Sequence, residues 1–329
     1  MTELPDPTHT LSQAEASTAF ADILDGLSSP DQITSFLVSL ADRGETAQEI
    51  AALVEEMRKR MISVSAPSKA IDVCGTGGDG SHSLNISTAT SLVVAACDVP
   101  MAKHGNRAAS SKSGAADTLE ALGLDLSKAG KNGEASIQEI GIAFFFAPNH
   151  HPALKALAPI RKAIGRRTIF NLVGPLVNPA KVKRQLIGVA STDLIEKYAQ
   201  AAILLGHEKT MIVSGEEGLD ELSISGPSQV AMIENGSIST SRIAPEDIGL
   251  QRHSAEAIKG GDAAFNAEAL RKLLMGEPSA YRDAVLLNSA AALMVADAVD
   301  SWEEGLEEAA EVIDKGLAKA LLDCWIAHQ

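Results

Sequence analysis

From residue 71 onward, short apolar runs alternate with segments of helical periodicity, and this alternation constrains the fold more than any other feature. The apolar runs are short enough to be buried strands, and they lie at 71–74, 101–103, 143–147, 186–190, 211–213 and 230–233. Helical patterns lie between them, for example at 88–97, 114–122 and 193–206. Strands separated by helices are typical of an α/β domain, so we predict a largely parallel central sheet.

The residues before this region have a different pattern, in which three helices are predicted by their starts. Each start fits a capping box, and the boxes pair Ser12 with Glu15, Ser29 with Gln32, and Thr46 with Glu49. The segment 63–69, SVSAPSK, is typical of a linker. We therefore expect a small helical domain at 1–66, completed by helices from about 150–182, and a large α/β domain at 67–329.

Composition and charge exclude several classes of protein. The chain has 329 residues, 45% of them hydrophobic, which is enough for one large domain or two. No apolar run reaches the roughly 20 residues that span a bilayer, and the first residues, MTELPDPTHT, lack the pattern of a signal peptide. Three widely spaced cysteines favour reduced thiols in the cytoplasm. A net charge of −15 disfavours nucleic-acid binding.

The glycine-rich segment 72–88, DVCGTGGDGSHSLNIST, joins a predicted strand to a predicted helix. Such a turn exposes backbone N–H groups, which favours an anion. No Gly-Lys-Ser/Thr follows the glycines, and their spacing does not fit the dinucleotide-binding fingerprint. A glycine turn without a ligand is the alternative. Asn85, Ser87 and Thr88 make that alternative weaker, because they place short polar side chains at the start of the helix.

A second segment, KHGNRAASSKSGAAD at 103–117, gathers potential cations among small residues. Small residues let the backbone approach a ligand closely, and Lys and Arg supply positive charge. The cations are Lys103, His104, Arg107 and Lys112. Taken alone, a segment of this kind is more often an ordinary exposed basic loop. Beside the glycine-rich segment, it suggests a ligand with two phosphate groups.

Two further segments carry weaker signals. In HHPALKALAPIRKAIGRRTIFNLVGPLVNPA, His151 and Arg161 recur at about helical spacing, and both also fit ordinary structural roles. In EEGLDELSISG, the adjacent acids Asp220 and Glu221 follow a predicted strand. Acids in such a place can hold Mg²⁺ that is also bound to substrate phosphates, although most acidic pairs are simply solvated.

Together these segments resemble the anthranilate phosphoribosyltransferase family over nearly the whole chain. The resemblance rests on CGTGGDG, NIST, KHGNRAASSKSGAADTLEALG, RTIFNLVGPLVNPA, GLDE and GGDAAFNAEAL. It implies the nucleoside-phosphorylase-like fold of class IV phosphoribosyltransferases, with a small all-helical domain, a large α/β domain and substrate in the cleft between them. It also implies a homodimer that forms through the helical domain.

The implied reaction transfers the 5-phosphoribosyl group of 5-phosphoribosyl-1-pyrophosphate to the amine of anthranilate, the second step of tryptophan biosynthesis. The resemblance assigns the donor to Gly75, Gly78, Asp79, Ser83, Asn85, Ile86, Ser87, Thr88, Lys103, His104, Gly105, Asn106, Arg107, Ala108, Ala109, Ser110, Ser111 and Ala115. It assigns anthranilate to Gly75, Asn106, His151 and Arg161, and two Mg²⁺ ions per subunit to Ser87, Asp220 and Glu221. Lys103 and Arg107 are the implied catalytic residues, with His104 as a further candidate.

The sequence departs from the family pattern at three positions: Ala115 replaces a usual serine, Ser83 a commoner threonine, and Glu217 the first aspartate of DGLDE. We leave Glu217 out of the metal site for this reason. Two alternatives remain, a pyrimidine nucleoside phosphorylase of the same fold and a non-catalytic nucleic-acid-binding relative. The segments KHGNR and RTIFNLVGPLVNP disfavour the first, and the charge of −15 disfavours the second.

Overall fold

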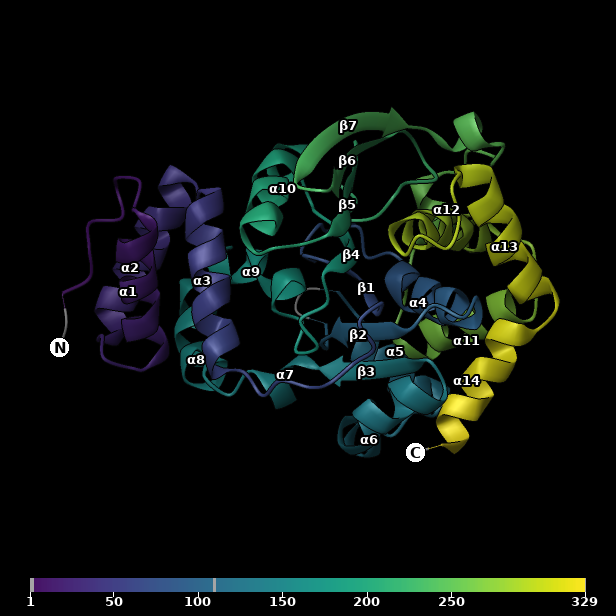
Figure 1. Ribbon diagram of the computed structural model, residues 1–329, viewed down its shortest axis with the longest axis horizontal. Coiled ribbons are helices and arrows are strands. Elements are labelled where there is room, and N and C mark those ends of the chain that lie inside the picture. Colours follow the sequence, from purple (N-terminus) through teal and green to yellow (C-terminus); the bar gives the residue numbers. More distant parts are fainter. Residues whose placement is uncertain (1–2, 109–110, 329) are drawn as a thin grey trace.

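The computed structural model describes residues 3–108 and 111–328. In these residues seven strands form one sheet, in the order β3-β2-β1-β4-β5-β6-β7 (Figure 1). The strands are β1 Ile71–Gly75, β2 Met101–Gly105, β3 Ile142–Phe146, β4 Arg184–Gly188, β5 Lys209–Gly215, β6 Ser228–Glu234 and β7 Ser237–Ile243. Strands β1 to β5 are parallel, and β6 and β7 are antiparallel. The predicted α/β architecture is confirmed. Strand β7 was missed, because all of its residues but the last are exposed and it lacks an apolar run.

The strand order reverses direction between β1 and β4. From β1 the chain first adds β2 and then β3 on one side of the sheet, and it then returns to add β4 and β5 on the other side of β1. In open α/β sheets, ligands bind outside the carboxyl ends of the strands at such a switch point. Gly75 and Gly188, which are register partners, end the two strands at this point. The switch point therefore locates the edge of the sheet where the site is expected.

Helices α1, α2 and α3 form a bundle that lies beyond one end of the sheet (Figure 1). Their bounds are Gln13–Leu24, Pro30–Arg43 and Ala47–Arg60. All three predicted capping boxes are present, so local sequence explains where each helix begins. The apolar cluster of the bundle also takes in residues of α8 Leu154–Ile164, α9 Ile169–Leu172 and α10 Ile195–Leu204, and of the adjacent sheet face.

The opposite face of the sheet is covered by a layer that contains most of the remaining helices (Figure 1). They include α4 Ile86–Ala96, α5 Ala115–Leu122, α11 Ala263–Leu274, α12 Ala280–Val295, α13 Trp302–Asp314 and α14 Leu317–Ala327. The alanine-rich C-terminal region is thus divided into four helices. Alanine lets these helices approach closely: Gly305 of α13 would clash with Ala290 of α12 if it carried a Cβ.

The other helical segments connect these layers. They are α6 Leu126–Glu139, α7 Ala147–His150, and the short 3₁₀ turns η1 Gly174–Val177, η2 Thr192–Leu194, η3 Pro245–Ile248 and η4 Ala255–Ile258. Helix α6 was not predicted, because its sequence LSKAGKNGEASIQE is largely polar and contains two glycines. No helix in the described part of the chain is long and apolar enough to cross a membrane.

Candidate functional site

Two glycines at the switch point let the loop after β5 approach the sheet. A Cβ on Gly75 would lie 2.3 Å from Asp220 Oδ2, and one on Gly188 would lie 1.6 Å from the Asp220 carbonyl oxygen. Both distances are far shorter than van der Waals contact. Asp220 Oδ2 also accepts a hydrogen bond from the Gly77 N–H at 2.6 Å. Only glycine at both strand ends allows Asp220 to lie against the glycine-rich loop.

Three carboxyl groups interact at this edge of the sheet, those of Asp79, Asp220 and Glu221. Burial and the nearby Asp79 raise the pKa of Asp220 to about 7. Burial, with Asp220 as the next cause, raises the pKa of Glu221 well above its usual range. Asp79 Oδ2 is buried and has no hydrogen-bond partner among the described residues. The cluster concentrates negative charge without enough positive charge to balance it, which favours the binding of a cation.

Lys103 is a buried cation whose charge acts on these acids. Its Nζ donates to the Val73 carbonyl at 2.7 Å and to Ser87 Oγ at 3.5 Å, and its charge lowers the pKa of Glu221. The N–H of Ser87 also stabilises the Glu221 carboxylate. The structure therefore brings together Lys103, Ser87, Asp220 and Glu221, which the family resemblance assigned to the donor and the metal; these roles stay predictions.

The glycine-rich loop itself faces open space. Gly77, Gly78 and Gly80 have φ values of +66°, +73° and +74°, which L side chains rarely adopt, and nothing lies within 4 Å of the Cβ that each lacks. The loop is supported from behind, where Ser83 forms an antiparallel bridge with Lys259. Its backbone is thus held in position with room for a ligand in front.

Helix α4 begins where the loop ends, and its first residues have different environments. Ile86 is 1% exposed and belongs to the core, so its side chain cannot reach a ligand. Thr88 is also buried, and no described residue bonds to its Oγ1. Asn85 lies just before the helix, and its side chain bonds to other parts of the protein. Of the predicted residues here, Ser87 alone has an established contact with the Lys103 side chain.

The second loop is folded onto α5. Arg107 donates to Asp117 Oδ1 at 2.8 Å and to both carboxylate oxygens of Glu120 at 2.5 and 3.0 Å. Asp117 Oδ2 accepts the N–H groups of Ala108 and Gly114 at 3.1 and 2.9 Å, which closes the loop. Arg107 is therefore bound to acids of α5 rather than to the switch-point cluster, and its catalytic role stays a prediction.

The other predicted residues of this loop lie along its path. Asn106 is exposed, and its Oδ1 accepts from the Arg107 N–H at 2.8 Å. Gly105 ends β2, where a Cβ would lie 3.3 Å from the Ala115 side chain. Ser111 Oγ donates to the Ser113 carbonyl at 3.3 Å. The predicted residues Ala109 and Ser110 lie outside the described residues.

His104 and His151 form a neutral aromatic pair, with ring centroids 5.4 Å apart and an edge-to-face orientation. Burial lowers the pKa of His104 to about 3 and that of His151 to about 4. Each Nε2 is buried and finds no hydrogen-bond partner in the described part of the chain. Because successive side chains of a strand point to opposite faces, His104 lies on the other side of β2 from Lys103.

Arg161 lies in α8 with its guanidinium carbon 5.6 Å from the centre of the Phe170 ring. Burial lowers the pKa of Arg161 from its usual range, but an arginine remains charged at any physiological pH. Within the described ranges, its guanidinium makes no hydrogen bond or ion pair. A partly buried cation without a counterion is suited to an anionic ligand.

Sequence reasoning missed one polar residue below the site, Asp72 in β1. It is fully buried and accepts hydrogen bonds from the His104 N–H at 3.1 Å, Asn178 Nδ2 at 2.8 Å and Gln185 Nε2 at 3.3 Å. These bonds tie the segment after η1 to three neighbouring strands. An aspartate inside an apolar run was the available signal, because a buried carboxylate needs several donors.

The switch-point residues fit Mg²⁺, although the described residues hold no ready set of three His, Cys, Asp or Glu ligands. Mg²⁺ prefers hard oxygen ligands, usually keeps several waters, and binds through one or two carboxylates plus substrate phosphates. Asp220, Glu221 and the Ser87 hydroxyl are oxygen donors of that kind. The buried Asp79 Oδ2 without a partner offers a further acceptor in the same place.

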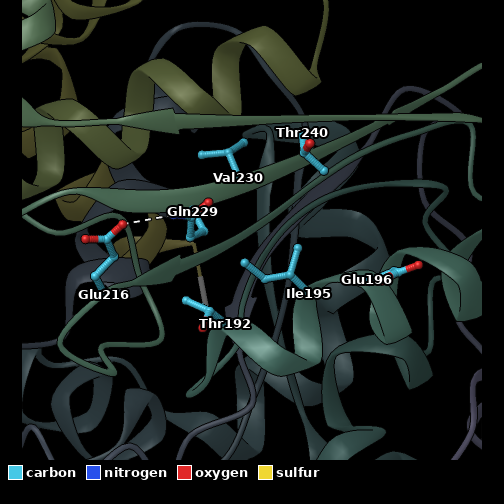
Figure 2. A pocket seen from close by; sticks show the side chains of 7 residues that line it. All are labelled: Thr192, Ile195, Glu196, Glu216, Gln229, Val230 and Thr240. Atoms are coloured by element: carbon cyan, nitrogen blue, oxygen red, sulfur yellow. Dashed lines mark hydrogen bonds between the residues drawn. The ribbon is translucent and has the colours of Figure 1, made fainter.

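A separate groove of about 420 Å³ lies between β6, β7 and the start of α10 (Figure 2). Its lining consists of Thr192, Ile195, Glu196, Glu216, Gln229, Val230 and Thr240. Glu216 is already bound there by Gln229 at 2.9 Å and by Arg242. None of the predicted site residues lines this groove, so it is distinct from the switch-point site.

Comparison with known families agrees with this architecture. Residues 6–61 match the helical bundle domain of a glycosyl transferase family, and residues 67–319 match its a/b domain. The fold and the site thus define a glycosyl transferase with a helical bundle and an α/β part.

Individual relatives narrow this class. The chain is 59% identical to the anthranilate phosphoribosyltransferase of Novosphingobium aromaticivorans over 99% of both chains. It is 60% identical to that of Sphingopyxis alaskensis, covering 99% of this chain and 98% of the relative. The chain belongs to the anthranilate phosphoribosyltransferase family, and the resemblance seen in the sequence is confirmed.

Solved structures of the family have the same fold. The enzyme of Thermus thermophilus has a TM-score of 0.92 and 39% identity, with 97% of this chain and 96% of that chain covered. The enzyme of Saccharomyces cerevisiae in complex with PRPP and Mg has a TM-score of 0.89 and 28% identity, with coverages of 97% and 94%. The predicted fold class is confirmed.

Proposed function

We propose that the chain transfers the 5-phosphoribosyl group of 5-phosphoribosyl-1-pyrophosphate to the amine of anthranilate and releases pyrophosphate. This reaction is the second step of tryptophan biosynthesis from chorismate. The observation that carries the proposal is the meeting of the glycine-rich loop, Lys103 and the carboxylates of Asp220 and Glu221 at one switch point. The full-length relatives named for this activity support it.

The donor is activated by electrostatics. When its C1–O bond breaks, positive charge develops on the sugar and negative charge on the leaving pyrophosphate. Lys103, free N–H groups of the glycine-rich loop and the Thr88 N–H at the start of α4 would stabilise the leaving group. Arg107 would join them by exchanging Asp117 and Glu120 for phosphate oxygens.

Ser87, Asp220 and Glu221 would hold Mg²⁺, and we propose two ions per subunit. Bound Mg²⁺ supplies positive charge that offsets the negative charge of the pyrophosphate. The raised pKa values of Asp220 and Glu221 support this assignment, because they reflect uncompensated negative charge. The presence of Mg with PRPP in the S. cerevisiae enzyme supports the choice of metal.

The acceptor would lie on the side of Arg161 and the histidine pair. Arg161 would bind the anthranilate carboxylate through two parallel N–H bonds, and its lack of a counterion among the described residues supports this role. The neutral rings of His104 and His151 would pack against the aromatic ring. A base with a pKa of about 3 takes up a proton poorly at neutral pH, so we assign His104 to packing. Gly75 and Asn106 complete the proposed acceptor site.

We further propose a domain boundary between residues 66 and 67 and a homodimer that forms through the helical domain. The boundary is supported by the two family matches, since the match to the helical bundle domain ends at residue 61 and the match to the a/b domain begins at residue 67. The cytoplasmic location stays a prediction from the cysteine pattern.

The direct test is to incubate the purified protein with Mg²⁺, 5-phosphoribosyl-1-pyrophosphate and anthranilate, and to follow the loss of anthranilate fluorescence. We expect a loss that requires all three components, and release of pyrophosphate in equal amount. A parallel assay with thymidine and phosphate should give no cleavage. Stable anthranilate fluorescence, or cleavage of thymidine, would contradict the proposal.

A further inference from the structure

Asn85 occupies the N-cap position of α4, but its side chain does not cap the helix. An asparagine in this position usually accepts a hydrogen bond from the N–H of the second or third helical residue. Here the side-chain oxygen instead accepts from Thr118 Oγ1 at 2.5 Å and from Asn266 Nδ2 at 2.8 Å. Two donors from α5 and α11 therefore occupy the atom that would otherwise cap α4.

Thr118 and Asn266, which donate these hydrogen bonds, are each held in place by further contacts. Asn266 is 2% exposed, and its Oδ1 accepts from the Gly261 N–H at 2.8 Å. Thr118 is fully buried, and its hydroxyl also contacts Ser113 Oγ at 2.9 Å. The Asn85 amide is thus fixed by groups that come from the second loop and from the C-terminal helices.

The Asn85 backbone is held by the same region. Its carbonyl oxygen accepts from the Tyr281 hydroxyl at 3.0 Å as well as from the Ala89 N–H at 3.1 Å. Tyr281 is 3% exposed, and burial raises its pKa above the usual range, so the hydroxyl keeps its proton and donates. The start of α4 is therefore anchored at Asn85 by side chains from α5, α11 and α12. Of its first N–H groups, that of Ile86 is bound by the Leu84 carbonyl and that of Ser87 stabilises Glu221, which leaves that of Thr88.

We propose that Thr118 and Asn266 are positioning residues that keep the Asn85 amide away from α4, so that the Thr88 N–H at the start of this helix remains available to a phosphate group of 5-phosphoribosyl-1-pyrophosphate. The inference rests on the proposed function, because it places that phosphate at the start of α4. If the hydrogen bond from Thr118 or from Asn266 is lost, the Asn85 side chain can turn and cap the helix. Capping stabilises a helix, but it would take the N–H of Thr88, the third helical residue, which the phosphate needs because the Ser87 N–H is engaged by Glu221.

The same contacts couple the two phosphate-binding loops. Asn85 ends the first loop, whereas Ser113 lies in the second loop and Thr118 in the helix that follows it, and Asn85 Nδ2 also donates to the Ser113 carbonyl at 3.4 Å. A change at Thr118 or Asn266 therefore acts on the donor side of the site. It leaves Arg161 and the histidine pair, which belong to other segments, unchanged.

The chain offers a matched pair of variants for the test, Thr118→Val and Thr90→Val. Both threonines are fully buried, and valine has nearly the same shape. The Thr118 hydroxyl donates to Asn85, whereas the Thr90 hydroxyl has no partner among the residues that the structure describes. The binding of 5-phosphoribosyl-1-pyrophosphate with Mg²⁺ is measured by calorimetry, and KM is measured for both substrates.

We expect Thr118→Val and Asn266→Ala to weaken donor binding by about 3- to 30-fold, the range for gain or loss of a helix cap. The KM for anthranilate should stay unchanged, and Thr90→Val should bind the donor as the unchanged protein does. Asn85→Ala combined with Asn266→Ala should bind the donor more tightly than Asn266→Ala alone, because the competing cap is then gone. If Asn266→Ala does not fold, as judged by a thermal melt, the two valine variants decide.

Equal donor affinities for Thr118→Val and Thr90→Val, in a protein that binds the donor normally, would overturn this inference alone. A parallel rise of both KM values would also overturn it, because that result indicates general damage to the fold. A lack of donor binding by the unchanged protein would overturn the proposed function as well.

Discussion

On the donor side of the site, groups of the protein itself bind the nitrogens of the two cations Lys103 and Arg107, whereas on the acceptor side the side-chain nitrogens have fewer partners among the described residues. Lys103 is held by the Val73 carbonyl and lies near the acids of the switch point. Arg161 has no counterion, and neither His104 Nε2 nor His151 Nε2 has a hydrogen-bond partner, among the described residues. A buried polar group without a partner costs free energy that a bound ligand can recover.

The difference matches the two proposed ligands. A pyrophosphate carries several charges and needs a preformed set of N–H groups and cations, which must be held in place before it binds. Anthranilate has one carboxylate and a large apolar ring, so one arginine and neutral aromatic walls suffice. If this comparison holds, variants on one side should affect the use of one substrate and spare the other.

The largest effect is expected for Lys103→Met on the donor side. Loss of a buried cation aimed at developing charge should lower kcat/KM by about 10²- to 10³-fold, as measured in the anthranilate fluorescence assay. Lys112→Met is the matched control, since Lys112 lies in the same segment but is exposed. Equal losses in the two variants would remove Lys103 from the site.

A second donor-side prediction concerns the acids of the switch point. Asp220→Asn combined with Glu221→Gln should raise the Mg²⁺ concentration needed for half-maximal activity by at least about tenfold, because two oxygen ligands lose their charge. Glu216→Gln, an exposed acid of the same loop, should leave the Mg²⁺ dependence unchanged. An unaltered Mg²⁺ titration in the double variant would contradict the metal assignment.

On the acceptor side, Arg161→Ala should weaken the use of anthranilate by about 10- to 150-fold, since a hydrogen bond to a charged group contributes roughly 1.5–3 kcal/mol. The KM for 5-phosphoribosyl-1-pyrophosphate should stay the same. Lys162→Ala, an exposed neighbour, is the control. Equal changes in both KM values would break the comparison between the two sides.

The smallest effect is expected for the pH dependence of the melting temperature, measured in the absence of Mg²⁺. The pKa of Asp220 is about 7 in the folded protein and about 3.8 without these neighbours. As the pH rises between these values, the unfolded chain releases its proton and the folded chain keeps it, so the stability that Asp220 contributes falls. The Tm of Asp220→Asn minus that of the unchanged protein should therefore increase from about pH 4 to about pH 7.

Buried histidines change stability in the opposite direction, because their lowered pKa values make the folded protein lose stability as the pH falls below about 6.5. This contribution is common to both proteins, so it cancels in the difference between their Tm values. A difference that stays constant across the pH range would show that Asp220 is not the source of uncompensated charge.

Features that depend on a few neighbouring residues were predictable from the sequence. The capping boxes at Ser12, Ser29 and Thr46 are present, since an N-cap is made by side chains three residues apart. The glycine-rich loop between β1 and α4 was also evident from its composition. The assignment of Lys103 and of the acids at 220 and 221 to one site followed from the family resemblance rather than from spacing.

Only the tertiary structure decided which distant residues form hydrogen bonds and ion pairs with the polar side chains of the site. Asn85 was predicted to contact substrate, yet its side chain bonds to Asn266, which is 181 residues distant. Arg107 was predicted to face the donor, yet acids of α5 bind it here. Asp72 stands out as an aspartate in an apolar run, but the run does not show which strands supply its hydrogen-bond donors. Local patterns specify which backbone conformation a segment takes, because they act over one or two turns. The partner of a buried polar side chain is chosen by how distant segments pack, and the sequence of either segment alone does not contain that information.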